Sequence, residues 1–193
     1  MGRLLDLDDC VLLVIDAQSA FYGSGGEAEE LRIALDRAAW LAGVATALGV
    51  PTVVTEEDPA RNGRTAARIL AALPREVAVF DKPVFGAADD PEILAGISAS
   101  GRRTAVLVGL ETDVCVTHTA LGLLDRGSRV AVVADATFAP GETHAAGLRR
   151  MTDAGAVILH AKGVYYEWIR TLEAARAFER DHPDLRDPPG FSL

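Results

Sequence analysis

Three side chains capable of nucleophilic chemistry stand near the ends of apolar segments in this sequence. Cys115 lies in the stretch GLETDVCVTHTALGLLDRG, which overlaps the end of the apolar run TAVLVGL. Asp16 closes the run CVLLVID, and Lys82 follows the run EVAVFD. A thiol, a carboxylate and an ammonium group at one site can attack an amide through a thioester that water then hydrolyses. The sequence therefore predicts acyl transfer, provided that the fold brings these residues together.

The position of Cys115 at the start of a helix favours a reactive thiol, and we expect Thr112 or Asp113 as the N-cap. Unpaired backbone N–H groups and the helix dipole lower the pKa of a thiol there below its usual value of about 8.5. The same N–H groups can hold the oxyanion of a tetrahedral intermediate. Asp16 is expected to take the thiol proton and pass it to a leaving amine, while Lys82 keeps Asp16 ionised.

Each of these residues also has a purely structural interpretation. A free cysteine such as Cys115 is often a core residue, and an aspartate at a strand end, such as Asp16, is often a turn or helix cap. A single lysine such as Lys82 is usually solvated. Their joint placement at strand ends favours the chemical interpretation. Cys10 opens its strand at the opposite end of the sheet, so we expect it to be structural.

The histidines give weaker signals. His118 follows Cys115 by three residues on a neighbouring helix face, so a Cys–His pair is an alternative. A helix neighbour usually points along the helix rather than over the nucleophile, which disfavours that pair. The other histidines form no spaced cluster, and we therefore expect no metal site and no cofactor; they are His144, His160 and His182.

The elements that must position these residues alternate along the chain. Six short runs are almost continuously apolar and rich in valine, as strands buried on both faces of a parallel sheet are: Cys10–Asp16, Val50–Thr55, Glu76–Asp81, Thr104–Leu110, Arg129–Asp135 and Ala156–His160. Segments of helical period separate them: Leu31–Leu48, Arg64–Ala72, Pro91–Ser98, Val114–Asp125, Thr143–Asp153 and Tyr165–Glu179.

This alternation predicts an α/β fold of three layers. We expect a doubly wound, Rossmann-like parallel sheet of six strands, with right-handed crossovers and helices on both faces. Ligands of such sheets bind beyond the carboxyl ends of the strands, where Asp16, Lys82 and Cys115 are expected. The chain is expected to form a single domain over residues 1–193, with a C-terminal arm from about residue 180 that packs on the domain or stays loose.

Composition excludes several classes of function. The 193 residues are 49% hydrophobic and 24% charged, which suits one domain with a sizeable core. The net charge of −9 argues against a nucleic-acid partner. The sequence contains no apolar run of about 18 residues, and its N-terminus is a poor signal peptide, so we expect neither membrane association nor export. Two distant cysteines predict no disulfide and suit a cytoplasmic protein.

Four stretches together make the chain similar to the isochorismatase-like cysteine hydrolases: LLVIDAQ, FDKPVFGA, VGLETDVCVTHTALGLLDRG and VAVVADATFA. The resemblance extends over about Val11–Trp168 and implies a catalytic Asp16–Lys82–Cys115 triad. It also implies a non-proline cis peptide at Leu110–Glu111, so that the N–H groups of Glu111 and Cys115 form the oxyanion hole. The family further implies the strand order 3-2-1-4-5-6 and a homodimer or homotetramer.

Two departures from related enzymes narrow the expected reaction. Metal-dependent nicotinamidases carry an Asp-x-His pair after the second strand, where this chain reads TEEDPARNG, with carboxylates but no histidine. Isochorismatases proper lack the cysteine that this chain keeps. The resemblance therefore implies a metal-independent hydrolase that cleaves an amide or a related C–N bond of a small molecule.

The pocket walls are predicted only from proximity to the triad. Gln18, Phe21, Phe85 and Thr119 are candidates for substrate binding, although both phenylalanines are equally compatible with the core. The aromatic stretch Tyr165–Trp168 is expected to pack against the sheet or a partner subunit.

Three hypotheses remain open from the sequence. The first is the cysteine hydrolase, with Cys115 as the nucleophile. The second is a catalytically idle binding or assembly module, in which Cys115 is unreactive. The third is a thiol redox sensor, which is weakened because no resolving cysteine lies near Cys115.

Overall fold

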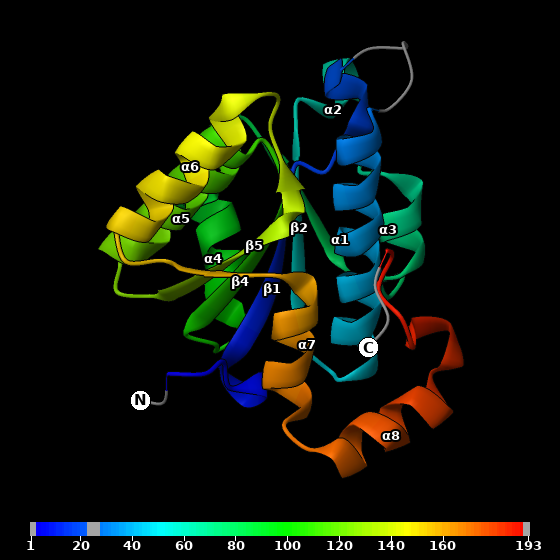
Figure 1. Cartoon of the computed structure of the whole chain (residues 1–193). Helices are drawn as coiled ribbons and strands as arrows, with labels where there is room; N and C mark the ends of the chain where they lie inside the picture. The colour runs from blue at the N-terminus through cyan, green and yellow to red at the C-terminus, as the bar shows by residue number, and fades with distance from the viewer. Residues whose placement is uncertain (1–2, 23–27, 191–193) are drawn as a thin grey trace.

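The computed structural model, which describes residues 3–22 and 28–190, is built on one parallel sheet (Figure 1). Its order is β3-β2-β1-β4-β5-β6, which confirms the predicted α/β fold and strand order. Chain order reverses between β1 and β4, so this is the switch point at which ligands of such sheets bind. The strands are β1 (Cys10–Ile15), β2 (Thr52–Glu57), β3 (Ala78–Lys82), β4 (Thr104–Leu110), β5 (Arg129–Phe138) and β6 (Val157–Leu159).

Helices cover both faces of the sheet (Figure 1). One face packs against α1 (Glu29–Ala47), α3 (Ala67–Ala71) and α7 (Ala161–Ile169), with α8 (Leu172–Asp181) extending that layer. The other face packs against α4 (Pro91–Ala99), α5 (Thr117–Asp125) and α6 (Glu142–Asp153). The short α2 (Pro59–Asn62) follows β2. Within the described ranges, no helix is long and apolar enough to cross a bilayer.

Burial on both faces explains why the strands are continuously apolar. In β1, Leu12 and Val14 belong to the core beneath α1, whereas Val11, Leu13 and Ile15 belong to the core beneath α4, α5 and α6. Side chains of a strand alternate between the two faces of a sheet, so a central strand between two helical layers needs an apolar residue at every position.

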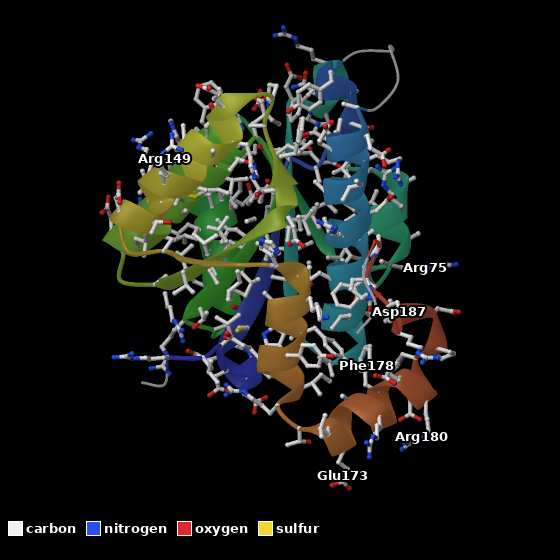
Figure 2. All side chains as sticks on the ribbon, viewed as in Figure 1. Arg75, Arg149, Glu173, Phe178, Arg180 and Asp187 are labelled. Carbon is white, nitrogen blue, oxygen red and sulfur yellow. The ribbon has the colours of Figure 1, made fainter. Side chains whose placement is uncertain are left out.

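The predicted helix Tyr165–Glu179 is wrong, because this segment forms the two helices α7 and α8. Arg170 ends α7 with a left-handed φ of 69°. Thr171 then begins α8, since its hydroxyl accepts a hydrogen bond from the backbone N–H of Ala174 at 3.1 Å. The turn brings Phe178 back onto Tyr165, with ring centroids 5.5 Å apart, whereas Glu173 and Arg180 point outward (Figure 2).

The C-terminal arm packs on α1 as far as residue 190. The indole Nε1 of Trp40 donates to the backbone oxygen of Leu185 at 2.9 Å, and Arg37 donates to that of Pro189 at 3.2 Å. Leu185 also lies against Gly43, where a β-carbon would approach it to 2.8 Å. Of the two alternatives for this arm, the structure therefore shows the packed one.

The aromatic stretch at α7 belongs mainly to the core. Tyr165 and Trp168 are buried in the apolar layer beneath α1, while Tyr166 is exposed. Packing against the body of the domain thus accounts for the two buried rings.

Candidate active site

The ends of β1, β3 and β4 bring Asp16, Lys82 and Cys115 into one buried cluster. The Nζ atom of Lys82 lies 2.8 Å from Oδ2 of Asp16 and 3.7 Å from Sγ of Cys115. All three side chains are almost fully shielded from solvent, with exposures of 0% for Asp16, 1% for Lys82 and 3% for Cys115. A buried ammonium group therefore stands between an acid and a thiol, as the sequence analysis requires.

Asp16 is held in an uncommon backbone conformation. Its φ is 43°, in the left-handed region that costs a residue other than glycine about 1–3 kcal/mol and is frequent at functional sites. The backbone N–H of Asp16 donates to the carbonyl of Thr55 at 3.1 Å, and the Thr55 hydroxyl donates to Oδ1 of Asp16 at 2.7 Å. These contacts with β2 leave Oδ2 of Asp16 directed at Lys82.

Lys82, the last residue of β3, is held by the loop that follows it. Its ammonium group donates to the backbone oxygens of Val84 and Phe85 as well as to Asp16. A buried charge is tolerated when an opposite charge and hydrogen bonds replace its hydration. The two carbonyls and the carboxylate fulfil this condition for Lys82.

Cys115 lies in a π-helical turn (Thr112–Val116) that links β4 to α5. The predicted side-chain cap by Thr112 or Asp113 is wrong, because Glu111 is the N-cap residue and makes no side-chain cap hydrogen bond. Thr112 instead places its hydroxyl 2.8 Å from Nδ1 of His144 in α6. The wider turn thus changes which residues begin the helix, although Cys115 still lies at the strand-to-helix junction.

Two glycines, Gly109 and Gly147, allow close backbone contacts on either side of the turn that carries Cys115. Gly109 has a φ of 118°, and a β-carbon there would lie 1.9 Å from the carbonyl oxygen of Ile15, so only glycine fits between β4 and β1. The next peptide, Leu110–Glu111, is cis, as the family resemblance implies. On the far side of the turn, Gly147 lets α6 approach the backbone of Asp113, since a β-carbon at Gly147 would come within 2.8 Å of it.

The predicted lowering of the thiol pKa is also wrong for the unliganded protein. Burial raises the pKa of Cys115 above its ordinary value, and the carboxylates of Asp16 and Glu57 raise it further, although Lys82 acts in the opposite direction. Burial likewise raises the pKa of Asp16 against the lowering effect of Lys82. The thiol therefore rests protonated, and Asp16 is a stronger base than an ordinary aspartate.

Glu57 is a residue of the site that was not predicted from the sequence. The predicted strand ends at Thr55, but β2 continues to Glu57, whose Oε2 accepts a hydrogen bond from the Cys115 thiol at 3.3 Å. The carboxylates in the stretch TEED were the signal from which Glu57 could have been found.

A further carboxylate near the turn, that of Glu111, is fixed by Tyr22, whose hydroxyl donates a hydrogen bond to it at 2.9 Å.

Donor atoms of Asp16, Glu57 and Cys115 lie within 4.8 Å of one another, close enough to bind a common metal ion. The ammonium group of Lys82 is 2.8 Å from Asp16 and therefore already supplies the positive charge that a cation would bring. Zinc sites in proteins are built mostly from cysteine and histidine, and none of the three residues of this cluster is a histidine. The donor set consequently fits thiol chemistry better than metal binding.

Cys115 lines a cavity of about 300 Å³ at the carboxyl edge of the sheet. Phe21 and Phe85 both line it, and Phe85 is 56% exposed, which excludes a core role for that ring. Phe85 also contacts His118 edge to face, with centroids 6.1 Å apart, and His118 itself is exposed. The remaining lining residues are Glu57, Arg61, Asn62, Glu111 and Val114.

The structure places Gln18 and Thr119 behind the cavity rather than among its described lining residues. Both are fully buried. The amide of Gln18 binds the backbone of Glu57 and Gly63, and the Thr119 hydroxyl accepts the backbone N–H of Ala87 at 3.0 Å. These contacts make both residues supports of the loops that form the site.

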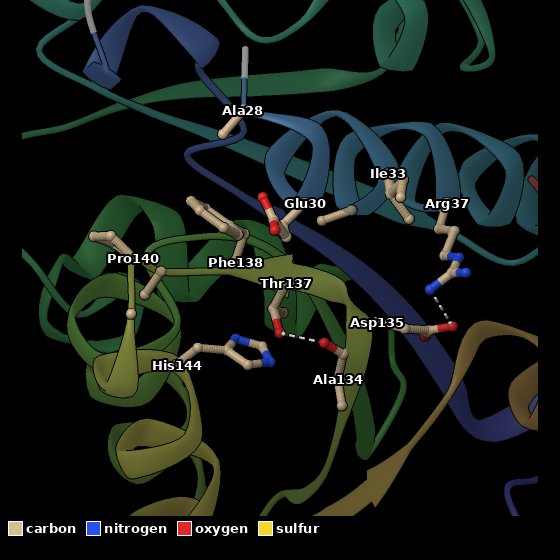
Figure 3. A pocket seen from close by; sticks show the side chains of 13 residues that line it. Ala28, Glu30, Ile33, Arg37, Ala134, Asp135, Thr137, Phe138, Pro140 and His144 are labelled. Atoms are coloured by element: carbon tan, nitrogen blue, oxygen red, sulfur yellow. Dashed lines mark hydrogen bonds and ion pairs between the residues drawn. The ribbon is translucent and has the colours of Figure 1, made fainter. Parts of the chain in front are cut away.

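A separate cavity of about 690 Å³ lies between α1 and the segment from β5 to α6 (Figure 3). An ion pair of 3.3 Å between Arg37 and Asp135 closes one end, and His144 points in from α6 (Figure 3). Its described lining residues include no cysteine or lysine. The nucleophile Cys115 therefore lines the smaller cavity and not this one.

Comparison with known proteins identifies the family. The Isochorismatase domain model matches residues 10–162. A secreted isochorismatase effector, Isc1 of Phytophthora sojae, is 32% identical over 172 residues, covering 86% of this chain and 80% of the relative.

Solved structures show the same relationship. The octameric hydrolase YcaC of Escherichia coli, of unknown specificity, superposes with a TM-score of 0.83 at 26% identity and covers 96% of this chain and 94% of its own. YcaC from Pseudomonas aeruginosa, with hexane-2,5-diol and covalent acrylamide, has a TM-score of 0.80 at 25% identity, with 96% and 95% covered. Together with the buried Asp16–Lys82–Cys115 arrangement, these matches show that the chain belongs to the isochorismatase family, as an isochorismatase-like hydrolase.

Proposed function

We propose that this protein is a metal-independent cysteine hydrolase that cleaves an amide or related C–N bond of a small molecule through a thioester at Cys115. The observation that carries this proposal is the position of Lys82, whose ammonium group contacts both Asp16 and the Cys115 sulfur beside a cavity. A structural role alone does not require a lysine charge to be buried between an acid and a thiol.

The reaction follows from the contacts at the sulfur. As the sulfur of Cys115 attacks the carbonyl carbon, its proton passes to Asp16, and a C–S bond forms. The backbone N–H groups of Glu111 and Cys115 receive the oxyanion. Protonated Asp16 then gives its proton to the leaving nitrogen as the C–N bond breaks. Water, deprotonated by Asp16, hydrolyses the thioester and restores the thiol.

The raised pKa values support a thiol that loses its proton only during attack. Burial keeps Cys115 neutral at rest, while the raised pKa of Asp16 makes its carboxylate a suitable proton acceptor. Lys82 stabilises the negative charge on the Asp16 carboxylate and on the developing Cys115 thiolate. Its role is electrostatic, and the proton passes between Cys115 and Asp16.

The relatives are compatible with this proposal. Escherichia coli YcaC is a hydrolase of unknown specificity, and the Pseudomonas aeruginosa YcaC structure contains covalent acrylamide. For this chain, a homodimer or homotetramer and a cytoplasmic location stay predictions. The relative from Phytophthora sojae is a secreted effector.

The catalytically idle module keeps one observation in its favour, since a buried thiol with a raised pKa is also what an unreactive cysteine shows. A redox pair with Cys10 has no geometric support. Cys10 pairs with Thr104 at the start of β4, whereas Cys115 lies beyond Leu110 at its end. A rise of about 3.3 Å per residue separates them by roughly 20 Å.

A screen of small amides for ammonia or amine release tests the proposal directly. Hydrolysis should be found in the wild type and in Cys10→Ala but lost in Cys115→Ala. Trapping with hydroxylamine should convert the intermediate to a hydroxamate. If Cys115→Ala still hydrolyses a substrate that the wild type accepts, the proposed mechanism is wrong.

A further inference from the structure

A second carboxylate, from Glu57, faces the reacting sulfur. Its Oε2 accepts a hydrogen bond from the Cys115 thiol at 3.3 Å, and Glu57 ends β2, whereas Asp16 follows β1. The backbone of Glu57 is clamped, because its N–H donates to Oε1 of Gln18 at 2.8 Å and its carbonyl accepts from Gln18 and Asn62, both at 3.0 Å. Since Gln18 is fully buried, this clamp fixes where the Glu57 side chain begins.

Glu57 also stands where two cavities meet. It lines the 300 Å³ cavity of Cys115 and a neighbouring cavity of about 720 Å³, and Phe85 is likewise common to both. A molecule whose carbonyl reaches the sulfur can therefore extend past Glu57 into the larger space. What lines that space then decides which substrates fit.

The larger cavity is strongly acidic. Its described lining includes five carboxylates, from Glu57, Asp58, Asp81, Asp90 and Glu92. Its one described cation, Lys82, is already paired with Asp16. On the sulfur side, Glu111 adds a carboxylate and Arg61, which is exposed, adds a positive charge. Carboxylates that converge on a concave surface focus a negative potential, which attracts cations and repels anions.

We propose that Glu57 is a specificity-determining residue that binds a positively charged ammonium or guanidinium group of the substrate, so that the protein acts on small cationic amides. This inference rests on the proposed hydrolase function and names its substrate class. In the free protein, the carboxylate of Glu57 accepts a hydrogen bond from the Cys115 thiol. A substrate N–H group that takes over this carboxylate leaves Asp16 as the acceptor for the Cys115 proton.

Charged thiol reagents test the inference without a known substrate. Methanethiosulfonates form a disulfide with Cys115 and release methanesulfinate, while the thiol proton leaves to base. The quantity measured is the rate of modification by the cationic aminoethyl reagent divided by the rate for the anionic sulfonatoethyl reagent. Dividing this ratio for Cys115 by the same ratio for glutathione gives a normalised ratio, which should be at least about ten. Peptide mass spectrometry separates Cys115 from Cys10.

Glu57→Gln should reduce this normalised ratio to within about threefold of unity, because it removes a negative charge that lies 3.3 Å from the sulfur. Glu76→Gln is the matched control. It changes the net charge equally, but Glu76 is exposed just before β3, at the opposite end of that strand from Lys82, and the normalised ratio should not change.

If Glu57→Gln does not fold, a second measurement uses the wild type alone. Raising the ionic strength from about 0.05 to 0.5 M should lower the wild-type ratio. A wild-type ratio near unity, or one that Glu57→Gln leaves unchanged, overturns the inference.

Amide hydrolysis separates this inference from the proposed function. Glycinamide, which is cationic, should be cleaved with a higher kcat/KM than the anionic amide succinamate, and Glu57→Gln should narrow the difference. Equal cleavage of both amides overturns the charge selection but leaves the hydrolase proposal intact. A strong reagent ratio without cleavage of any amide supports the charge selection and contradicts the hydrolase proposal.

Discussion

The two cysteines of this protein show how position changes the meaning of a buried thiol. Cys10 begins β1 at the amino edge of the sheet, and Cys115 follows β4 at the carboxyl edge. Both are buried, and burial is the main cause that raises the pKa of each. Their surroundings differ. Cys10 belongs to the apolar core with Trp168, whereas Cys115 contacts Lys82 and Glu57 beside a cavity.

Burial therefore does not distinguish a structural from a chemical cysteine here. The charged groups that converge on the sulfur and the access to a cavity make the difference. The carboxyl ends of parallel strands collect such groups because the loops there come from several segments distant in sequence. At the amino edge, Asp9, Arg129 and Asp6 act on the pKa of Cys10 through space, while the side chain itself lies in the apolar core.

The largest expected effect separates the two thiols. Cys115→Ala should lower kcat for a verified substrate by at least about 10³-fold, since the covalent step is lost. Cys10→Ala should keep kcat within about twofold but lower the free energy of unfolding by roughly 1–2 kcal/mol, because it leaves a small cavity. Urea unfolding and steady-state kinetics measure both. Equal kcat for the two variants would show that Cys115 has no catalytic role that Cys10 lacks.

Asp16→Asn should have the next largest effect. Asparagine tolerates the left-handed φ of 43°, so the backbone should persist, but the proton acceptor is lost and kcat should fall about 10²–10⁴-fold. The uncompensated Lys82 charge should lower the free energy of unfolding by roughly 3–5 kcal/mol.

Adding Lys82→Met to Asp16→Asn sharpens this prediction, because it removes the unpaired charge. The double variant should regain most of the stability of the wild type without regaining activity. Recovery of kcat would show that the pair supports the fold rather than the chemistry.

The pH dependence should follow the raised pKa values. Asp16 accepts a proton only when ionised, so kcat/KM should fall on acidification with an apparent pKa above the ordinary 3.8 of an aspartate. The raised pKa of the thiol means a smaller thiolate fraction than in glutathione, so iodoacetamide should modify Cys115 more slowly at about pH 8. Alkylation faster than that of glutathione would contradict the charge arrangement described here.

The smallest effect is expected at the start of α8, outside the site around Cys115. Thr171→Ala removes the hydroxyl that caps α8 and should lower the free energy of unfolding by about 1 kcal/mol, with kcat/KM unchanged. Thermal unfolding and kinetics on the same sample check this. Thr171→Ser, which retains the hydroxyl, is the control and should behave as the wild type. A change in kcat/KM would show that the C-terminal helices influence the site.

Much of the fold could be predicted because its signals are local. Strands buried on both faces must be continuously apolar, and CVLLVID and TAVLVGL therefore locate β1 and β4 closely. Asp16, Lys82 and Cys115 follow strand ends, so the topology of a parallel sheet places them at one edge before any contact is known. The break at Arg170 was not predictable from period, since a left-handed residue other than glycine leaves no pattern in the sequence.

The sequence by itself thus determined the order of strands and helices, the family resemblance and the residues delivered to the edge of the sheet. Only the tertiary structure decided that Glu57 contacts the sulfur, that Gln18 and Thr119 support loops, and that the pKa of Cys115 is raised. Strand placement depends on hydrophobic period along the chain. The proton affinity of a thiol depends instead on charges and burial in three dimensions, to which β1, β2 and β3 contribute together.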